Sequence, residues 1–277
     1  MMTGTGTQAD PYKPTTWAEF LSCTTADSVY TELPVGGGVF DMNAYYPEGI
    51  PATIPLKGFI NGNGWEIRNA YWEKDQAAFQ LSSNETYGYI ENLNFINGRV
   101  NGKTGHSGLI GSYALDYSGK PLRNCKLSGR VERNGADCCT FTRFGNQATL
   151  FECSMNLMLV DKNCTIDANE YYDNCTAKYC KLELDMPEKF YSSGLCVRLD
   201  NSYITGHISH FYLRTSTTSV FDCEIDDFLT QYQGTSTNVL VNTDKFTGTL
   251  PSGCIGVTTA QLKDAAYLSS IGFPIQT

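Results

Sequence analysis

One short pattern recurs along the whole chain and limits the folds it can adopt. It consists of an apolar or aromatic residue, then Asn or an acidic residue, a small residue, one polar residue and an apolar one. The pattern is centred on Asn69, Asn92, Asn124, Glu152, Asn174, Asn201 and Asp222, with a looser copy at Asn238. These anchors lie between 16 residues (from Asp222 to Asn238) and 32 residues (from Asn92 to Asn124) apart. Repeats of about this length with irregular inserts are typical of solenoids, and their alternating apolar residues favour strands over helices.

The anchor residues predict a bend that is stacked from one repeat to the next. Asn accepts unusual backbone angles, and stacked Asn side chains can hydrogen-bond to the repeats on either side. The residue after each anchor is small or apolar, as an inward position requires: Ala70, Leu93, Cys125, Cys153, Cys175, Ser202, Cys223 and Val239. Because Cys behaves as a small buried hydrophobic residue, we interpret the four cysteines as a core ladder rather than a redox array.

Helix signals at both ends predict caps for the solenoid. Thr16 and Glu19 form a capping-box pattern, and Trp17, Phe20 and Leu21 give that helix an apolar face. A second helix is expected to begin at Thr258 or Thr259 and to end near Gly272, before Pro274. Leu262, Ala265, Ala266 and Leu268 or Ser269 are predicted to cover the last coil. The sequence therefore predicts one domain: cap and first strands (1–57), parallel β-helix (58–257), and C-terminal capping helix and tail (258–277).

Charge and composition exclude several classes of partner. A net charge of −9 and a pI of about 4.8 disfavour nucleic acid and anionic membranes. No apolar run approaches the roughly 20 residues of a membrane helix, so membrane insertion is not expected. The first residues carry no export signal, which predicts synthesis in the cytoplasm and thiols rather than disulfides for the 11 cysteines.

Candidate catalytic and metal-binding residues form no convincing set. The acidic candidates are Asp200, Asp222, Glu224, Asp226 and Asp227. Asp200 and Asp222, as neighbouring anchors, could come within catalytic range of each other, although acids beside bends usually cap turns. The histidines are His106, His207 and His210, and the spacing of the last two places them on opposite faces of a strand. Cys138 and Cys139 are adjacent, and Cys175 and Cys180 are five apart with no His nearby. We expect no catalytic, cofactor-binding or metal-binding residues and no cofactor.

The remaining signals concern turns and surfaces. Gly62 to Gly64 (GNG) predicts a turn between coils, and the N-x-S/T patterns at Asn84, Asn163 and Asn174 carry little weight without a secretory signal. Three aromatic pairs stand out: Tyr71 with Trp72, Tyr171 with Tyr172, and Phe211 with Tyr212. In a strand one member of each pair points inward and one outward. The outward rings could bind sugar or protein, and the alternative is that these rings stack inside the coil or against a cap.

Several segments resemble a known family. They are GTGTQADPYKPTTWAEF, FINGNGWEIRNAYW, IENLNFINGRV and the ending QLKDAAYLSSIGF. They are similar to right-handed parallel β-helix, pectin-lyase-like proteins of gut bacteria and their phages, over the first ~110 and last ~20 residues. The resemblance implies an all-β fold, a single-stranded right-handed parallel β-helix with short N- and C-terminal capping helices. Proteins of this kind occur in tail fibres, tailspikes, head fibres and cell-surface adhesins.

These observations predict a structural and surface-binding component of a bacteriophage virion: a fibre, spike or capsid-decorating protein. The expected partners are other copies of the chain (a homotrimer), other virion proteins and a host surface glycan. One alternative is a polysaccharide lyase or glycoside hydrolase of the same fold. Another alternative is a bacterial surface adhesin, which would need an anchor or an export signal.

Overall fold

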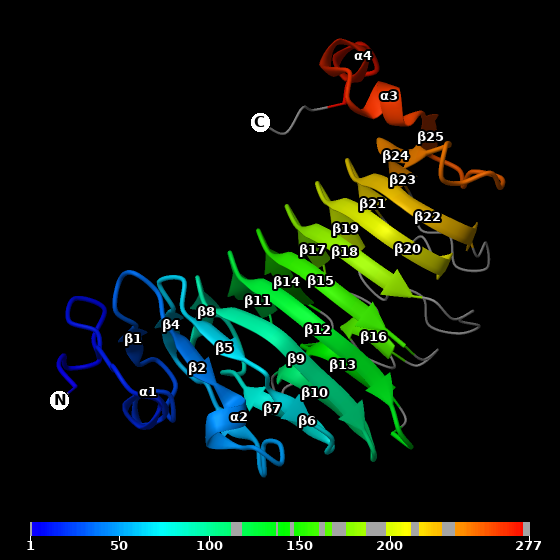
Figure 1. Cartoon of the computed structure of the whole chain (residues 1–277). Coiled ribbons are helices and arrows are strands. Elements are labelled where there is room, and N and C mark those ends of the chain that lie inside the picture. Colours follow the sequence, from blue (N-terminus) through cyan, green and yellow to red (C-terminus); the bar gives the residue numbers. More distant parts are fainter. Residues whose placement is uncertain are drawn as a thin grey trace.

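The protein is a parallel β-solenoid, as the repeats predict. The computed structural model describes residues 2–111, 118–136, 138–144, 147–160, 164–167, 176–186, 198–211, 216–228 and 236–273. Every pairing between its strands is parallel, and successive coils lie side by side along one axis (Figure 1). The strands form three sheets, which we call the short-strand, long-strand and third sheets.

The short-strand and long-strand sheets run the length of the molecule. The short-strand sheet contains β1 (Tyr30–Glu32), β4 (Phe59–Asn61), β8 (Tyr89–Glu91), β11 (Ser118–Arg123), β14 (Gln147–Phe151), β17 (Thr176–Lys178), β19 (Arg198–Asp200), β21 (Ser216–Thr217) and β23 (Ser236–Thr237). The long-strand sheet contains β2 (Val39–Asp41), β5 (Glu66–Arg68), β6 (Tyr71–Trp72), β9 (Asn94–Gly102), β12 (Lys126–Arg133), β15 (Ser154–Leu159), β18 (Lys181–Met186), β20 (Tyr203–Phe211), β22 (Val220–Phe228), β24 (Val239–Asn242) and β25 (Cys254–Val257). Both sheets expose an outer face, because their strands alternate buried and accessible side chains.

The third sheet is covered on both faces where it can be described. It contains β3 (Ile54–Pro55), β7 (Gln76–Gln80), β10 (His106–Gly111), β13 (Cys138–Arg143) and β16 (Cys164–Asp167). All residues of β10 after His106 are buried. The Arg143 side chain lies against Gly108 and Gly111, and its guanidinium contacts Asp75 at 3.7 Å. This sheet therefore offers no open surface in its described coils.

The predicted bend is the corner between the short-strand and long-strand sheets. Asn92, Asn124, Glu152, Asn201 and Asn238 occupy it with left-handed backbone angles, φ between 48° and 54°. Asn has the side chain best suited to this conformation, which is why its recurrence revealed the corner.

Two predicted anchors are wrong, and one lies outside the described residues. Asn69 follows β5 and belongs to a bend within the long-strand sheet, where Asn97 of the next coil donates to its side chain at 2.7 Å. Asp222 lies inside β22, and Thr218 (φ 48°) forms the corner of that coil. Asn174 is not described, and Tyr179 (φ 55°) is the corner residue after β17. Thr and Tyr rarely adopt this conformation, so these two corners cannot be recognised from their residue type.

The residue after the corner points inward, as predicted, but the ladder has different members. The register places Leu93, Cys125, Cys153, Cys180, Ser202, Ser219 and Val239 in one column. Cys180 replaces the predicted Cys175, which is outside the described residues, and Ser219 replaces Cys223. Cys223 is buried within β22, and Ala70 is buried beyond the Asn69 bend.

The thiols of this column act as buried hydrogen-bond donors rather than as a redox pair. The Sγ atoms of Cys153 and Cys180 donate to the carbonyls of Leu122 and Leu150 in the preceding coil, at 3.7 and 3.1 Å. Burial raises the pKa of the Cys125 thiol well above its ordinary value. The cysteines that are described are free: Cys23, Cys125, Cys139, Cys153, Cys164, Cys180, Cys223 and Cys254. These findings support the core-ladder interpretation.

The N-terminal cap forms as predicted, with one change in the capping contact. Helix α1 (Trp17–Cys23) begins after Thr16, whose side chain accepts from the Glu19 amide. Trp17 and Phe20 are buried against Phe40. The Glu19 carboxylate accepts from the backbone and hydroxyl of Thr15 (2.9 and 3.0 Å) instead of closing the box on Thr16. A further one-turn helix, α2 (Met42–Tyr45), follows β2.

The C-terminal cap differs from the prediction of one helix over the last coil. Two short helices form, α3 (Thr259–Leu262) after a complete Thr258–Gln261 capping box and α4 (Ala265–Ser270). They pack on the outer face of the long-strand sheet, where Leu262 and Leu268 join the cluster of Val220, Leu240, Val257 and Phe273. Ala265, Ala266 and Ser269 are exposed. Phe246 and Leu250, from the segment between β24 and β25, contact the main core instead. None of the helices that can be described is long and apolar enough to span a membrane.

Candidate functional site

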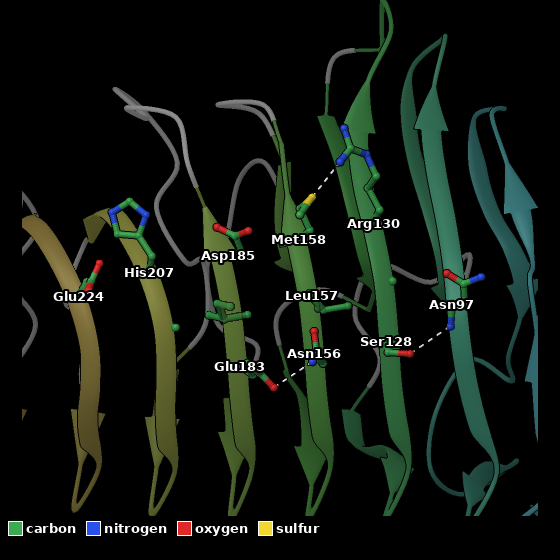
Figure 2. A pocket seen from close by; sticks show the side chains of 13 residues that line it. Asn97, Ser128, Arg130, Asn156, Leu157, Met158, Glu183, Asp185, His207 and Glu224 are labelled. Atoms are coloured by element: carbon green, nitrogen blue, oxygen red, sulfur yellow. Dashed lines mark hydrogen bonds between the residues drawn. The ribbon is translucent and has the colours of Figure 1, made fainter.

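The clearest hollow in the described surface is a groove along the outer face of the long-strand sheet. Its volume is about 840 Å³, which lies within the range of ligand-binding pockets. One side carries Ser128, Asn156 and Glu183, and the other carries Arg130, Met158, Asp185, His207 and Glu224 (Figure 2). Gly129, Leu157, Leu184 and Gly206 lie between them. The residues of each side are direct partners in the strand register, so the groove crosses the strands along the solenoid axis.

A change of charge along the axis is the main electrostatic feature of this groove. Its N-terminal end is flanked by Arg130 and, one coil earlier, by its register partner Arg99. Its C-terminal end holds Glu183, Asp185 and Glu224. The central coil contributes the uncharged Asn156 and Met158. The face is therefore basic at one end, neutral in the middle and acidic at the other end.

The side chains at the basic end contact each other more than those at the acidic end. Glu132 accepts from both Arg99 (2.5 Å) and Arg130 (2.8 Å), so one carboxylate serves two guanidinium groups. These ion pairs hold the pKa of Glu132 below its ordinary value, although burial opposes this. Within the described part of the chain, Asp185 and Glu224 have no hydrogen-bond or ion-pair partner. The acidic end is thus the part of the groove whose carboxylates can accept further hydrogen bonds or ion pairs.

The two acids considered for catalysis do not form a pair. Asp200 ends β19 in the short-strand sheet, and Asp222 lies in β22 of the long-strand sheet. Asp200 accepts from Lys178 (2.8 Å), Thr217 (2.7 Å) and Asn201 (2.6 Å). The prediction that Asp222 is a corner anchor directly above Asp200 is therefore wrong, because Asp222 lies inside β22 and Thr218 forms that corner.

Both carboxylates are held as anions. Asp222 accepts from Tyr203 (2.6 Å), Asn242 (2.7 Å) and Lys245 (2.8 Å). Burial alone would raise the pKa of Asp200 and Asp222, but these hydrogen bonds and the lysine charges lower both. A general acid needs a raised pKa, so neither residue suits that role.

The other candidates are dispersed or only partly described. His207 projects from the groove and contacts Asp226 at 3.2 Å, whereas the side chains of His210 and Asp227 are not described. His106 begins β10, far from the groove, and its backbone amide donates to Asp75. No three His, Cys, Asp or Glu side chains in the described ranges are grouped so that they could hold a metal ion.

A second surface feature, a stripe of large side chains, crosses the outer face of the short-strand sheet. We define the stripe as Tyr30, Phe59, Tyr89, Arg123, Phe151, Lys178 and Tyr179. Tyr30 and Phe59 stack at 4.4 Å, and Phe59 meets Tyr89 edge-to-face at 5.2 Å. The Arg123 guanidinium lies 3.4 Å from the Tyr89 ring centroid, and Phe151 meets Tyr179 at 5.7 Å. The stripe therefore consists of two sets of aromatic and cationic contacts, which meet where Arg123 and Phe151 are register partners.

The exposure of the rings decides what the stripe can bind. Tyr30 and Phe59 stack on each other along the solenoid axis, Arg123 lies above the Tyr89 ring, and Lys120 lies above the Phe151 ring. These contacts cover ring faces and leave mainly ring edges toward solvent. Stacking of a sugar needs a free ring face, so the stripe is poorly suited to that contact. Tyr179 is the exception, since it is 45 % exposed. The stripe fits a protein surface better than a saccharide.

Sequence patterns found part of these surfaces. Trp72 is buried and Tyr71 is partly exposed, as alternation predicts, with Arg99 above the Tyr71 ring. Tyr171, Tyr172 and Tyr212 and the side chain of Phe211 are not described. The aromatic pairs in the sequence do not reveal the stripe. An alignment of the chain on its corner residues would have shown it, because Tyr89 lies three positions before a corner and Phe151 and Lys178 lie one position before a corner, all on one face of the sheet.

The remaining sequence signals have structural roles or are not described. Gly62 to Gly64 form a turn, but it joins β4 to β5 within one coil instead of linking coils. The Asn84 side chain accepts from the Thr86 amide at 3.0 Å, as in a local turn. Asn163 and Asn174 are outside the described residues. Cys139 and Cys180 are buried, which places neither at the surface as a metal ligand.

Comparison with protein-family models, with curated proteins and with solved structures finds no match to this chain.

Proposed function

We propose that this chain is a non-enzymatic structural and surface-binding component of a bacteriophage particle: a fibre, spike or capsid-decorating protein. The observation that carries the binding role is the open face of the long-strand sheet, where a groove crosses β12, β15, β18, β20 and β22 and where Asp185 and Glu224 have no partner among the described residues. The assignment to a phage particle rests on the motif resemblance. A capped, parallel solenoid supports it, because such a rod presents long faces at fixed geometry.

The electrostatics of the acids supports a role other than catalysis. Asp200 and Asp222 lie on different sheets and are each held by three donors. Hydrolases of this type need two carboxyl groups separated by about 5 to 10 Å across the scissile bond, one of them protonated. A polysaccharide depolymerisation assay on the full chain tests this directly. Release of reducing ends or unsaturated sugars, abolished by Asp222→Asn, would contradict the proposal.

The proposed partners are further copies of the chain, as a homotrimer, other particle proteins and a host glycan. One observation favours a glycan in the groove: Ser128, Asn156 and Glu183 offer hydroxyl, amide and carboxylate groups at successive coils. Neighbouring strands lie about 4.8 Å apart, similar to the length of one sugar unit. Binding of the full chain to immobilised glycans, with Asn156→Ala and Glu183→Ala as weakened variants, tests this occupant.

The particle assignment has its own experiment. Antibodies against the purified chain should label particles released from lysed host cultures, and the chain should co-sediment with capsid proteins. A chain found only in the soluble fraction, or anchored to the bacterial surface, would favour the adhesin alternative.

A further inference from the structure

We propose that the C-terminal part of the stripe of one copy (Arg123, Phe151, Lys178 and Tyr179) binds in the groove on the long-strand sheet of a second copy at the same height, with the two solenoid axes parallel. The inference rests on the proposed self-association and specifies its surfaces, and it assigns the groove to a second copy in place of a glycan. It follows from the opposite charge polarity of the two exposed faces, which can be compared coil by coil because each coil contributes one strand to each sheet.

At the N-terminal end the short-strand face is acidic where the long-strand face is basic. Glu91 ends β8, and the same coil continues through the corner into β9, which carries Arg99. Arg99 is exposed and shares Glu132 with Arg130. Two copies side by side at the same height therefore bring Glu91 of one copy to the level of Arg99 of the other.

At the C-terminal end the two polarities are reversed. Lys178 ends β17, and the same coil continues into β18, which carries Glu183 and Asp185. Asp185 has no partner within the described part of the chain, so its carboxylate can accept an incoming lysine. Lys178 contacts Asp200 at 2.8 Å, but its side chain is still 36 % exposed.

Between the charged levels the two faces are less polar. Phe151 of β14 and Met158 of β15 belong to one coil, and both are partly exposed. Gly129 and Gly206 in the groove carry no side chain, because a Cβ there would meet the backbone oxygen of Gly98 or Leu184 in the neighbouring strand. Burial of Phe151, Met158 and the exposed Tyr179 would supply the apolar centre that stable interfaces contain.

At one coil the contact brings two positive charges to the same height, and each of them is paired with an acidic residue of its own copy. Arg123 and Arg130 belong to the same coil, one on each face. Arg123 forms an ion pair with Glu85, and Arg130 forms one with Glu132. Each arginine therefore reaches the contact beside a carboxylate, which Arg123 has to itself and Arg130 shares with Arg99, and this limits the repulsion.

The contact joins two different surfaces, so it is heterologous. Repetition of such a contact closes a ring when the rotation between copies permits it. The homotrimer proposed above is the ring expected here. All copies in it would point in the same direction along the axis, which leaves the capped ends free for other particle proteins.

Sedimentation velocity of the full chain at micromolar concentration tests the contact. Asp185→Lys and Lys178→Glu should each weaken association at least about tenfold, because each places like charges at one level. The two changes together in one chain should restore most of the loss. Glu48→Lys, in an exposed turn on neither face, carries the same charge change as Asp185→Lys and should leave association unchanged.

A second variant separates association from folding. Tyr179→Asn removes an exposed aromatic ring but places Asn at a left-handed corner, so the fold should be at least as stable while association weakens. Trimers that persist in Asp185→Lys and Tyr179→Asn would overturn the assigned surfaces but leave the proposed self-association intact. A monomeric wild-type chain would overturn both. A wild-type monomer that binds a glycan, lost on Asp185→Lys, would identify the glycan as the occupant of the groove.

Discussion

The corner between the short-strand and long-strand sheets is stabilised by side chains outside the coil in the N-terminal half of the solenoid and by side chains inside the coil in the C-terminal half. In the N-terminal coils a ladder of amides lies outside: Asn92 donates to Asn61 at 3.1 Å, and Asn124 donates to Asn92 at 2.7 Å. In the C-terminal coils a ladder of hydroxyls lies inside: Ser202 accepts from the Cys180 amide at 3.1 Å and donates to the Ala177 carbonyl at 2.9 Å.

This difference shows what the corner requires. A left-handed residue interrupts the regular pairing of adjacent coils, so nearby backbone groups need other partners. An outer ladder needs Asn at each corner, but Glu152, Tyr179 and Thr218 interrupt the column of Asn. The inner ladder needs only a small polar residue at the next position, and Ser219 extends it by accepting from the Ser202 amide at 3.2 Å. The inner ladder therefore permits corner residues other than Asn.

The largest expected effect comes from breaking the inner ladder. Ser202→Ala removes only the hydroxyl and leaves the buried Cys180 amide and Ala177 carbonyl without it. Each buried group left unsatisfied costs about 1–3 kcal/mol, so we expect unfolding to become easier by about 3 kcal/mol. Urea denaturation followed by circular dichroism measures this. Ser202→Cys, which keeps a donor as Cys180 does, should lose less. Equal stability of the Ala variant and wild type would show that the inner ladder is dispensable.

Breaking the outer ladder should cost less, because the amides are partly solvated. Asn92→Ala removes its bonds to Asn61 and Asn124 and imposes a left-handed angle on Ala, for a total of about 2 kcal/mol. Asn92→Gly tolerates the angle and should recover about half of that loss. The same denaturation experiment applies. If Gly and Ala were equally destabilising, backbone strain would have no part in the preference for Asn.

The two ladders also explain how far the sequence could predict the structure. Parallel coils, an Asn corner and a small inward residue after it were predictable, because the Asn corners recur with a conformation that few residues accept. The corner could not be found at Tyr179 or Thr218, where the inner contacts impose the angle. Asn69 looks like a corner residue in the sequence because the bend between β5 and β6 requires the same left-handed backbone conformation as a corner. The groove was not predictable, since it depends on the register between strands and on loop lengths that hydrophobic patterns leave open. The stripe is predictable only at those coils whose corner residue can be recognised.

Converting a C-terminal corner to the N-terminal type should increase stability modestly. Thr218 holds a β-branched side chain at φ 48°, which is unfavourable. Thr218→Asn should therefore raise the free energy of unfolding by about 1 kcal/mol. A higher urea midpoint with an unchanged slope would support this. A lower midpoint would mean that the Thr side chain makes a contribution that outweighs its strain, and Thr218→Gly would then separate strain from lost side-chain contacts.

The smallest expected effect is on how the free energy of unfolding depends on pH, and it arises from Asp222 in the C-terminal coils. Hydrogen bonds from Tyr203 and Asn242 and the charge of Lys245 hold the pKa of Asp222 below its ordinary value, despite burial. A carboxyl group whose pKa is lower in the folded state takes up a proton more readily when unfolded. Its contribution to stability is therefore complete above the ordinary Asp pKa and is lost as the pH falls toward the folded value. Asp222→Asn should flatten the acid side of a plot of unfolding free energy against pH, and Tyr203→Phe should flatten it less. An acid limb as steep in Asp222→Asn as in wild type would mean that other carboxylates cause the acid sensitivity of this half of the solenoid.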